Sequence, residues 1–316
     1  MRHVAGEHGI HPGAGGTAAG SSRGAGRRGL AWAMVLAGIV MIVEIAGGVR
    51  SNSLALISDA GHMFTDFVAL GLALFAVSMA CRAASPKVTF GYYRIEILAA
   101  LGNGVLLTLV AGWLFYEATL RIANPPAVAA PVVLVVSVIG LAANIAGLRI
   151  LRRASGDNLN IRGAAMHVLS DALSSGAVVV SGTVIALTGW YRIDPILSYL
   201  IGVFIIVGAI RLLKESVDVL LEATPAGIDL ESLQNEIRAI DGVREVHDLH
   251  VWSITSGMPA FSGHVIVQAT TLSHSDRVLN EIKEILRSRY GIGHTTIQIE
   301  SEAYMEIGEI HDAVPG

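Results

Sequence analysis

Two histidine–aspartate pairs lie inside long apolar stretches of this 316-residue chain. His62 and Asp66 are four residues apart, and so are His167 and Asp171. Residues four apart stand on the same face of a helix, one turn from each other. Each pair therefore offers one imidazole and one carboxylate in the same direction. Two such helices facing each other would supply the four ligands of a tetrahedral zinc site.

Hydrogen bonding between packed helices is the alternative interpretation of these polar residues. Ionisable groups at membrane depth are costly, and a buried carboxylate needs a partner that offsets its desolvation. Because the pattern occurs in two stretches, it favours a metal site over packing alone. Asp59 shares the face of His62 and Asp66, and it is a candidate to orient His62, to accept a proton or to face solvent.

Other polar residues in the apolar stretches have weaker signals. Asn103 and Asn144 are interpreted as helix-packing residues, because amides hydrogen-bond between membrane helices. For Glu44 and Glu117 three interpretations remain: the side chain faces solvent, pairs with another residue, or has a functional role. The single cysteine, Cys81, excludes an intramolecular disulfide and a Cys-x-x-Cys metal motif.

The composition indicates a membrane protein. Hydrophobic residues make up 53% of the chain and charged residues only 15%, whereas about 25% of residues are charged in ordinary soluble domains. A membrane-spanning helix needs roughly 20 predominantly apolar residues. This length predicts six transmembrane helices, at 30–49, 54–80, 95–120, 128–149, 163–188 and 195–213.

Basic residues are unequally divided between the two sides that six spans would define. Thirteen Lys and Arg would lie on one side, and only Arg50, Arg121 and Arg192 on the other. Basic residues concentrate in cytoplasmic loops, so both termini are predicted to be cytoplasmic. The expected organisation is a six-helix transport domain over 30–215 in the lipid bilayer and a cytoplasmic domain over 222–310.

The segments outside the spans differ from each other in composition. Residues 1–29 are rich in Gly, Ala and Ser and predict a disordered cytoplasmic tail, in which His3, His8 and His11 are candidates for weak metal binding. Residues 223–316 carry six Lys/Arg and fourteen Asp/Glu, a net charge of −8. An acidic domain argues against nucleic acid as a partner and suits either cation handling or a solvated acidic surface.

The C-terminal periodicity predicts a small α+β domain. The order helix, strand, strand, helix, strand suggests an antiparallel sheet with helices on it. Helical spacing or strand alternation places these elements at 229–240, 243–254, 261–270, 275–290 and 295–300.

Six histidines fall in this domain, where a solvated surface histidine is the default interpretation of each. The candidates for a zinc site are His247, His264, His274 and Glu300. His247 and His250 are three residues apart on a strand, so they should point to opposite faces unless a bulge intervenes. One metal site is therefore not expected to use both.

Several segments resemble the cation diffusion facilitator family. Ser53–Asp66 resembles the family's second span, Phe90–Glu96 the segment before the third, and the motif His167–Asp171 the fifth. Val246–Trp252 and His294–Glu300 resemble cytoplasmic segments of its zinc-transporting branch. The resemblance covers about 30–310, and it implies a homodimer with six spans per chain and a metallochaperone-like domain of ferredoxin-like fold.

The resemblance also implies roles for individual residues. It implies that the family's transport ligands are His62, Asp66, His167 and Asp171, with the histidine of the second span marking zinc selectivity. It implies that the cytoplasmic ligands are His247 and His264, with His274 as a candidate bridge. Gln298 and Glu300 stand where some members of the family have His and Asp. This chain therefore departs from the ligand set of a full binuclear site in the cytoplasmic domain. Arg94 is expected to pair with an acid at the end of the sixth span, Asp218 or Glu222.

These observations together predict a secondary active transporter that exports zinc in exchange for protons. Zn²⁺ is then the substrate and a candidate regulatory ligand, divalent ions and protons are the partners, and no organic cofactor is expected. The loop between spans four and five has no histidine, which within the family favours a bacterial protein of the inner membrane. A membrane-anchored zinc sensor without transport is the alternative. The chain lacks the His-Glu-x-x-His motif of a zinc hydrolase, and tight ligation argues against a channel.

Overall fold

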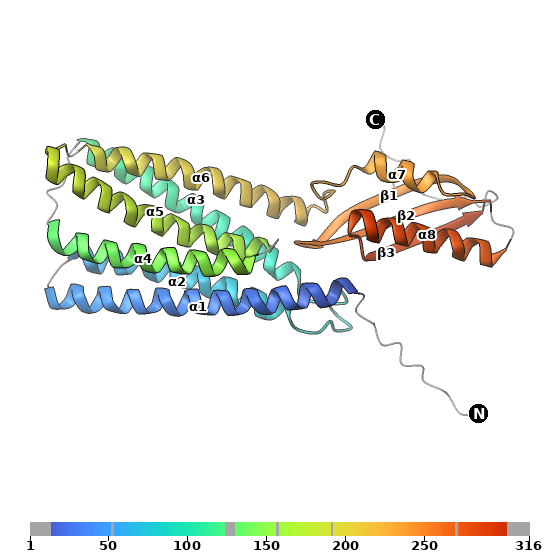
Figure 1. Cartoon of the computed structure of the whole chain (residues 1–316), viewed down its shortest axis with the longest axis horizontal. Coiled ribbons are helices and arrows are strands. Elements are labelled where there is room, and N and C mark those ends of the chain that lie inside the picture. The colour runs from blue at the N-terminus through green and yellow to red at the C-terminus, as the bar shows by residue number, and fades with distance from the viewer. Residues whose placement is uncertain are drawn as a thin grey trace, which may run out of the picture. The chain divides into compact units, whose positions relative to one another are not determined.

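The computed structural model describes residues 14–51, 54–123, 130–155, 158–190, 192–268 and 271–301 (Figure 1). The chain divides into two compact units. The helical unit includes Gly24–Ala223, and the C-terminal unit includes Thr224–Trp252 and the residues from Met258 onward.

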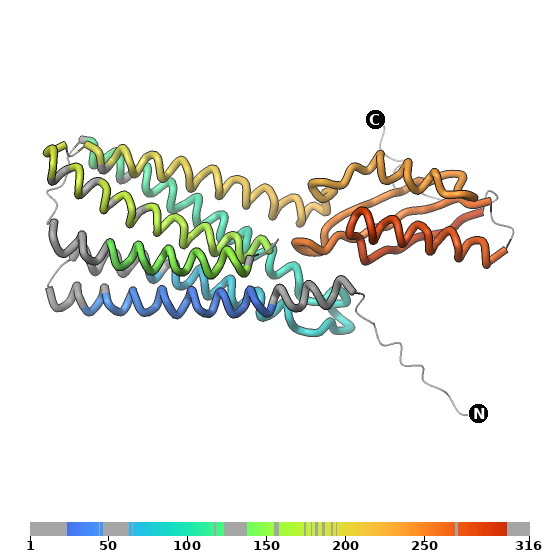
Figure 2. Tube along the Cα trace, viewed as in Figure 1, coloured from blue at the N-terminus to red at the C-terminus, as the bar shows by residue number. Residues whose placement is uncertain are grey.

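Six long helices form the helical unit and run side by side (Figure 2). The described residues of all six predicted spans fall on helices. By length and composition three of the described segments can cross a membrane: Gly24–Val43, Arg94–Ile122 and Pro195–Leu220. The helices are α1 (Ala14–Ser51), α2 (Leu54–Ala80), α3 (Arg94–Ala123), α4 (Ala130–Ser155), α5 (Leu159–Thr188) and α6 (Ile193–Leu220).

The first helix begins earlier than its apolar segment predicts. Residues 1–29 were expected to form a disordered tail, but α1 begins at Ala14, and this part of the prediction is wrong. Residues 14–29 contain six glycines and only four alanines, so intrinsic propensity does not favour helix there. They continue directly into an apolar helix, which extends them cooperatively. Residues 1–13 lie outside the described part of the chain.

Helix α5 takes part in both apolar cores of the helical unit. One core joins it to α1, α2 and α4 through residues that include Leu70, Ala73 and Ala164. The other joins it to α3 and α6 through residues that include Leu159 and Leu212. The residues of α5 therefore face neighbours on several sides, which is why polar side chains on this helix are withdrawn from lipid.

Charged residues connect helix ends within the helical unit. The guanidinium of Arg94, at the start of α3, lies 2.6 Å from a carboxylate oxygen of Glu222, just after α6. This contact confirms the expected pairing of Arg94 and selects Glu222 rather than Asp218. Arg162 at the start of α5 pairs with Glu215 in α6 through two contacts, at 2.6 and 3.3 Å. Both pairs are partly exposed, so each contributes modestly to stability.

The C-terminal unit has the element order that the sequence predicts. Helix α7 (Leu230–Arg238) precedes strands β1 (Val243–Thr255) and β2 (Met258–Val267), and helix α8 (Leu272–Tyr290) leads to β3 (His294–Ser301). Both helices are amphipathic and bury residues such as Ile237 and Ile282 in one core with residues of the sheet, which include Val246 and Phe261. Asp229 caps α7 by accepting a hydrogen bond from the backbone N–H of Glu231. Hydrogen bonds, first that of the Ser232 hydroxyl, hold the pKa of Asp229 below its usual value.

The three strands lie in the order β1-β2-β3, and the expectation of an antiparallel sheet is wrong for one of the two strand pairs. Strands β2 and β3 are parallel, with register from Ala260 opposite His294 to Val267 opposite Ser301. The physical reason is α8, which connects these strands. A helical crossover carries the chain back along the sheet, so the next strand enters in the same direction.

Candidate functional site

Asp66 of α2 and His167 of α5 meet inside the helical unit. Nδ1 of His167 lies 3.7 Å from Oδ1 of Asp66, and the two side chains are 2% and 16% exposed. Nε2 of His167 is buried and has no hydrogen-bond partner among the described residues. The two predicted motifs, which are separated by about a hundred residues of sequence, thus bring an imidazole nitrogen and a carboxylate oxygen together.

The register between α2 and α5 explains this approach. The side-chain amide of Asn160 donates a 2.7 Å hydrogen bond to the backbone oxygen of Ala73. Asn160 is seven residues before His167 on α5, and Ala73 is seven residues after Asp66 on α2. Two antiparallel helices that touch at Ala73 and Asn160 touch again two turns along, at Asp66 and His167.

The other two predicted ligands lie on the same helices, one turn from the meeting pair. Asp171 is half-buried and has interactions of its own. His62 belongs to α2, but its side chain lies outside the described part of the structure, as does that of Asp59. The same holds for His311 and for five further candidates: Glu44, Glu117, and the N-terminal His3, His8 and His11.

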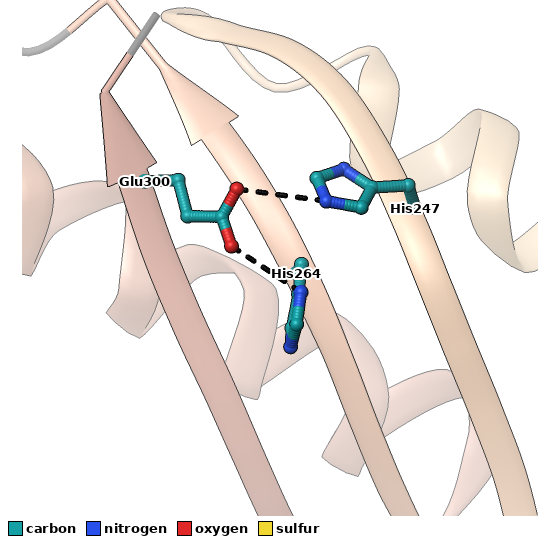
Figure 3. Close-up of side chains that lie close together, drawn as sticks. All are labelled: His247, His264 and Glu300. Carbon is teal, nitrogen blue, oxygen red and sulfur yellow. Dashed lines mark ion pairs between the residues drawn. The ribbon is translucent and has the colours of Figure 1, made fainter. Parts of the chain in front are cut away.

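A second cluster lies in the C-terminal unit, where each strand contributes one residue (Figure 3). Nε2 of His247 in β1 lies 3.5 Å from Oε2 of Glu300 in β3. Nδ1 of His264 in β2 lies 3.2 Å from Oε1 of the same carboxylate. The ligand atoms all lie within 4.8 Å of one another. Donors bound to one zinc ion in a tetrahedron are roughly 3.3–3.5 Å apart, so the two histidine–Glu300 contacts, each to a different carboxylate oxygen, are close to this spacing.

The parallel register places His264 and Glu300 on one face of the sheet. His264 is paired with Gln298, and Glu300 is two residues further along β3, so all three point the same way. Nε2 of Gln298 donates a 2.8 Å hydrogen bond to Oε1 of Glu300. The Glu300 side chain is only 4% exposed, and such a buried carboxylate needs hydrogen bonds or cations around it.

Strand β1 does not alternate regularly around this cluster. Val246 and Val251 are both buried in the core, although residues five apart on a regular strand point to opposite faces. Between them Asp248 has a φ of 46°, a left-handed conformation that aspartate tolerates better than most residues. The expectation that His247 and His250 point to opposite faces assumes that side chains alternate regularly along β1. Because the kink at Asp248 interrupts this alternation, the spacing of three residues no longer predicts opposite faces.

Asp248 lies between two histidines. Its Oδ1 is 2.9 Å from Nε2 of His250, and its Oδ2 is 3.9 Å from Nε2 of His264. The imidazole of His264 therefore has Glu300 near one nitrogen and Asp248 near the other. Sequence reasoning missed Asp248, because the signal is the backbone kink rather than the residue type.

His274 lies apart from the cluster. It is in the first turn of α8, where its Nδ1 accepts a 3.0 Å hydrogen bond from Arg277, and its ring contacts Gly242. The structure thus joins His247, His264 and Glu300 but does not bring the fourth candidate to them. His294, at the start of β3, is exposed.

Known families match both units. Residues 30–221 match the family described as "Cation efflux transmembrane domain", and residues 225–302 match "Cation efflux protein, cytoplasmic domain". The metal cation efflux system protein CzcD of Cupriavidus metallidurans is 43% identical over 277 residues, which are 88% of this chain and 87% of that protein.

Two further relatives and one solved structure are similar to this chain. The cadmium, cobalt and zinc/H(+)-K(+) antiporter of Bacillus subtilis is 40% identical over 90% of this chain and 92% of its own. The zinc transporter ZitB of Escherichia coli is 40% identical over 82% of this chain and 83% of its own. The metal-bound C-terminal domain of CzcD from C. metallidurans matches with 37% identity and a TM-score of 0.22, covering 23% of this chain and 99% of that domain.

Proposed function

This chain belongs to the cation efflux family, in its zinc, cobalt and cadmium efflux group, and we propose that it exports Zn²⁺ from the cytoplasm in exchange for protons. Family membership makes it a divalent-cation efflux transporter of the membrane rather than an enzyme. We propose three things beyond family membership: that the ion is zinc, that its export is coupled to protons, and which residues bind them.

The observation that carries the proposal is the approach of Asp66 and His167. Their 3.7 Å separation is close to the distance between two ligands of one zinc ion, roughly 3.3–3.5 Å. His62 and Asp171 lie one turn away on the same helices and complete a set of two nitrogens and two carboxylates. This mixed set suits zinc, whereas an all-oxygen set would suit harder cations.

Proton exchange follows from the chemistry of these ligands. Zinc binds neutral imidazole and ionised carboxylate, so binding displaces protons and protonation expels the metal. A site that faces the two sides of the membrane in turn would then load zinc where protons are scarce and release it where they are abundant. Competition between protons and zinc at this one site is enough to couple their movements.

The proposed architecture extends the two family domains. Residues 30–215 would cross the inner membrane six times, with both termini and the 222–310 domain in the cytoplasm. The distribution of basic residues supports this orientation. The α7-β1-β2-α8-β3 order supports a ferredoxin-like relationship, and the match to the cytoplasmic domain of cation efflux proteins supports a homodimer.

We assign His247, His264 and Glu300 to a regulatory zinc site in the cytoplasmic domain. Two imidazoles and a carboxylate at 3.2 and 3.5 Å contacts would supply three ligands and leave a fourth position for water or another group. His274 is not included, because its ring lies with Arg277 and Gly242.

Zinc uptake into proteoliposomes tests the proposed function. With the purified protein reconstituted and an imposed pH gradient, the initial rate of zinc uptake is expected to rise with the gradient. Uptake that ignores the gradient would contradict proton coupling. Zinc binding without any uptake would favour the membrane-anchored sensor instead.

His62→Asp is expected to shift the preference from zinc toward cadmium. The change replaces a nitrogen ligand with an oxygen ligand and alters the size of the site. A change of about 1.4 kcal/mol at one ligand shifts the ratio of zinc to cadmium uptake rates about tenfold. The measurement is uptake of both ions by the same proteoliposomes, and an unchanged ratio would argue against a selectivity role for His62.

Asp248→Asn is expected to weaken zinc binding in the cytoplasmic domain. The Asp248 carboxylate lies 3.9 Å from the outer nitrogen of His264, an electrostatic contact rather than a hydrogen bond. Its loss should therefore cost less than the roughly 10–100-fold that a hydrogen-bonded outer partner costs. Asn tolerates the left-handed backbone of position 248, so the fold should persist. Zinc titration of the purified protein checks this, with Asp241→Asn as the control, since Asp241 is 99% exposed.

A further inference from the structure

Among the buried residues of the helical unit, Asn103, Asn160 and His167 keep polar atoms without hydrogen-bond partners among the described residues. The atoms are both amide atoms of Asn103, Oδ1 of Asn160 and Nε2 of His167. The three residues are 1%, 0% and 2% exposed. Buried polar groups in native proteins are almost always hydrogen-bonded to protein, water or ions, so such a concentration of unsatisfied atoms indicates a place where a polar ligand passes or binds.

These residues form a series along α5. Asn160 lies in the first turn of this helix, and His167 is two turns further on. Gly163 is between them and lies against α3, where a Cβ atom on it would be 3.3 and 3.4 Å from Cβ and Nδ2 of Asn103. The order from the start of α5 is thus Asn160, then Asn103, then His167.

A packing role does not account for Asn103. An asparagine that joins helices does so through hydrogen bonds, and the amide of Asn103 makes none among the described residues. Asn160 does make one, from its Nδ2 to the backbone oxygen of Ala73 at 2.7 Å. Its Oδ1 stays without a described partner. The helix-packing interpretation of Asn103 therefore leaves its burial unexplained.

We propose that Asn103 is a transit contact for a partly hydrated divalent cation on its way between the start of α5 and the His167 site, with Oδ1 of Asn160 as the preceding contact. This inference rests on the proposed function, in which His167 holds the transported zinc and α5 starts at the cytoplasm. Amide groups suit this role because they are neutral. They can bond the water around an ion or contact the ion itself, yet they hold it weakly enough for release.

Asn103→Leu tests the inference, because leucine has a similar size and no polar atoms. The maximal zinc uptake rate is expected to fall about tenfold, on the order of one lost hydrogen bond in the transport barrier. Equilibrium zinc affinity, measured with His264→Ala in the background, is expected to stay within about twofold. Asn144→Leu is the matched control, an asparagine of α4 for which uptake should not change.

A second variant separates transit from packing. Asn103→Ser keeps a polar group but loses volume, so it should retain more uptake than Asn103→Leu if polarity matters. A packing role predicts the reverse order. Uptake by Asn103→Leu close to that of the unmodified protein would overturn the inference, and so would the reverse order of the two variants.

Cysteine accessibility gives a readout that does not depend on the leucine variant folding. In a Cys81→Ser background, a water-soluble thiol reagent should modify Asn103→Cys, and zinc should slow the reaction. Ala111→Cys, at another buried position of α3, should not react. No modification of Asn103→Cys would overturn the inference. Normal transport by His167→Ala would contradict the proposed function itself. If His167→Ala loses transport but Asn103→Leu transports normally, only the present inference is wrong.

Discussion

His167→Ala is expected to reduce zinc uptake to the background of protein-free liposomes. The change removes the buried imidazole that meets Asp66 at 3.7 Å, and with it one of the proposed four ligands. Removing only an outer partner of a ligand costs roughly 10–100-fold, so removing the ligand itself should cost more. Alanine at a helical position retains helix propensity, and the variant should still fold.

His294→Ala is the matched control for this experiment. His294 is an exposed histidine at the start of β3, so its loss should leave uptake unchanged. Size-exclusion profiles and circular dichroism of both variants establish that the helices persist. Efflux by a correctly folded His167→Ala protein at the rate of the unmodified protein would refute the assignment of the transport site.

His264→Ala is expected to abolish zinc binding in the cytoplasmic domain. His264 is the central member of the cluster, since its Nδ1 lies 3.2 Å from Glu300 and its ring meets that of His247 edge to face at 5.3 Å. Without it, His247 and Glu300 supply only two ligands, and affinity should fall by more than the roughly 10–100-fold that an outer partner costs. Zinc titration of the full-length protein with a competing chelator measures the change.

His274→Ala separates the cluster from the other histidine candidate. The ring of His274 accepts a hydrogen bond from Arg277 and does not join the three-residue cluster. Zinc affinity of this variant should therefore match that of the unmodified protein. If His274→Ala loses as much zinc as His264→Ala, the structural assignment of the cluster is wrong and the bridging role considered from sequence gains support.

The two centres differ in burial, and this difference has a kinetic consequence. His167 is almost fully buried in the helical unit, whereas His247 and His264 are 23% and 18% exposed. A partly exposed site exchanges ions with solvent directly, but a buried one requires the helices to open. We therefore associate the exposed cluster with sensing of the metal and the buried pair with its movement.

The sequence was sufficient for those features that depend on local periodicity. The apolar stretches predicted the six long helices, apart from residues 14–29 of α1, and the four-residue spacing in two of them indicated that Asp66 and His167 belong together. The alternation around His264 and the spacing around Ile282 predicted the strand and the helix that contain them. Such signals are short-range, so one sequence reveals them.

Other features depend on how distant elements meet, and the sequence did not determine them. The parallel pairing of β2 and β3 depends on the path that α8 takes over the sheet. The separation of His274 from the cluster depends on where α8 begins relative to Gly242. The residue type at position 248 does not predict the kink, because aspartate is also common in ordinary turns that flank strands.

Simultaneous recording of zinc and proton movement tests the central claim most directly. Proteoliposomes containing the purified protein would receive a zinc gradient, with a zinc indicator and a pH indicator enclosed in the lumen. The proposed exchange predicts that the lumen becomes more alkaline as zinc enters, and that His167→Ala removes both signals. Zinc entry with no change in luminal pH, or both signals intact in His167→Ala, would contradict proton-coupled export through this site.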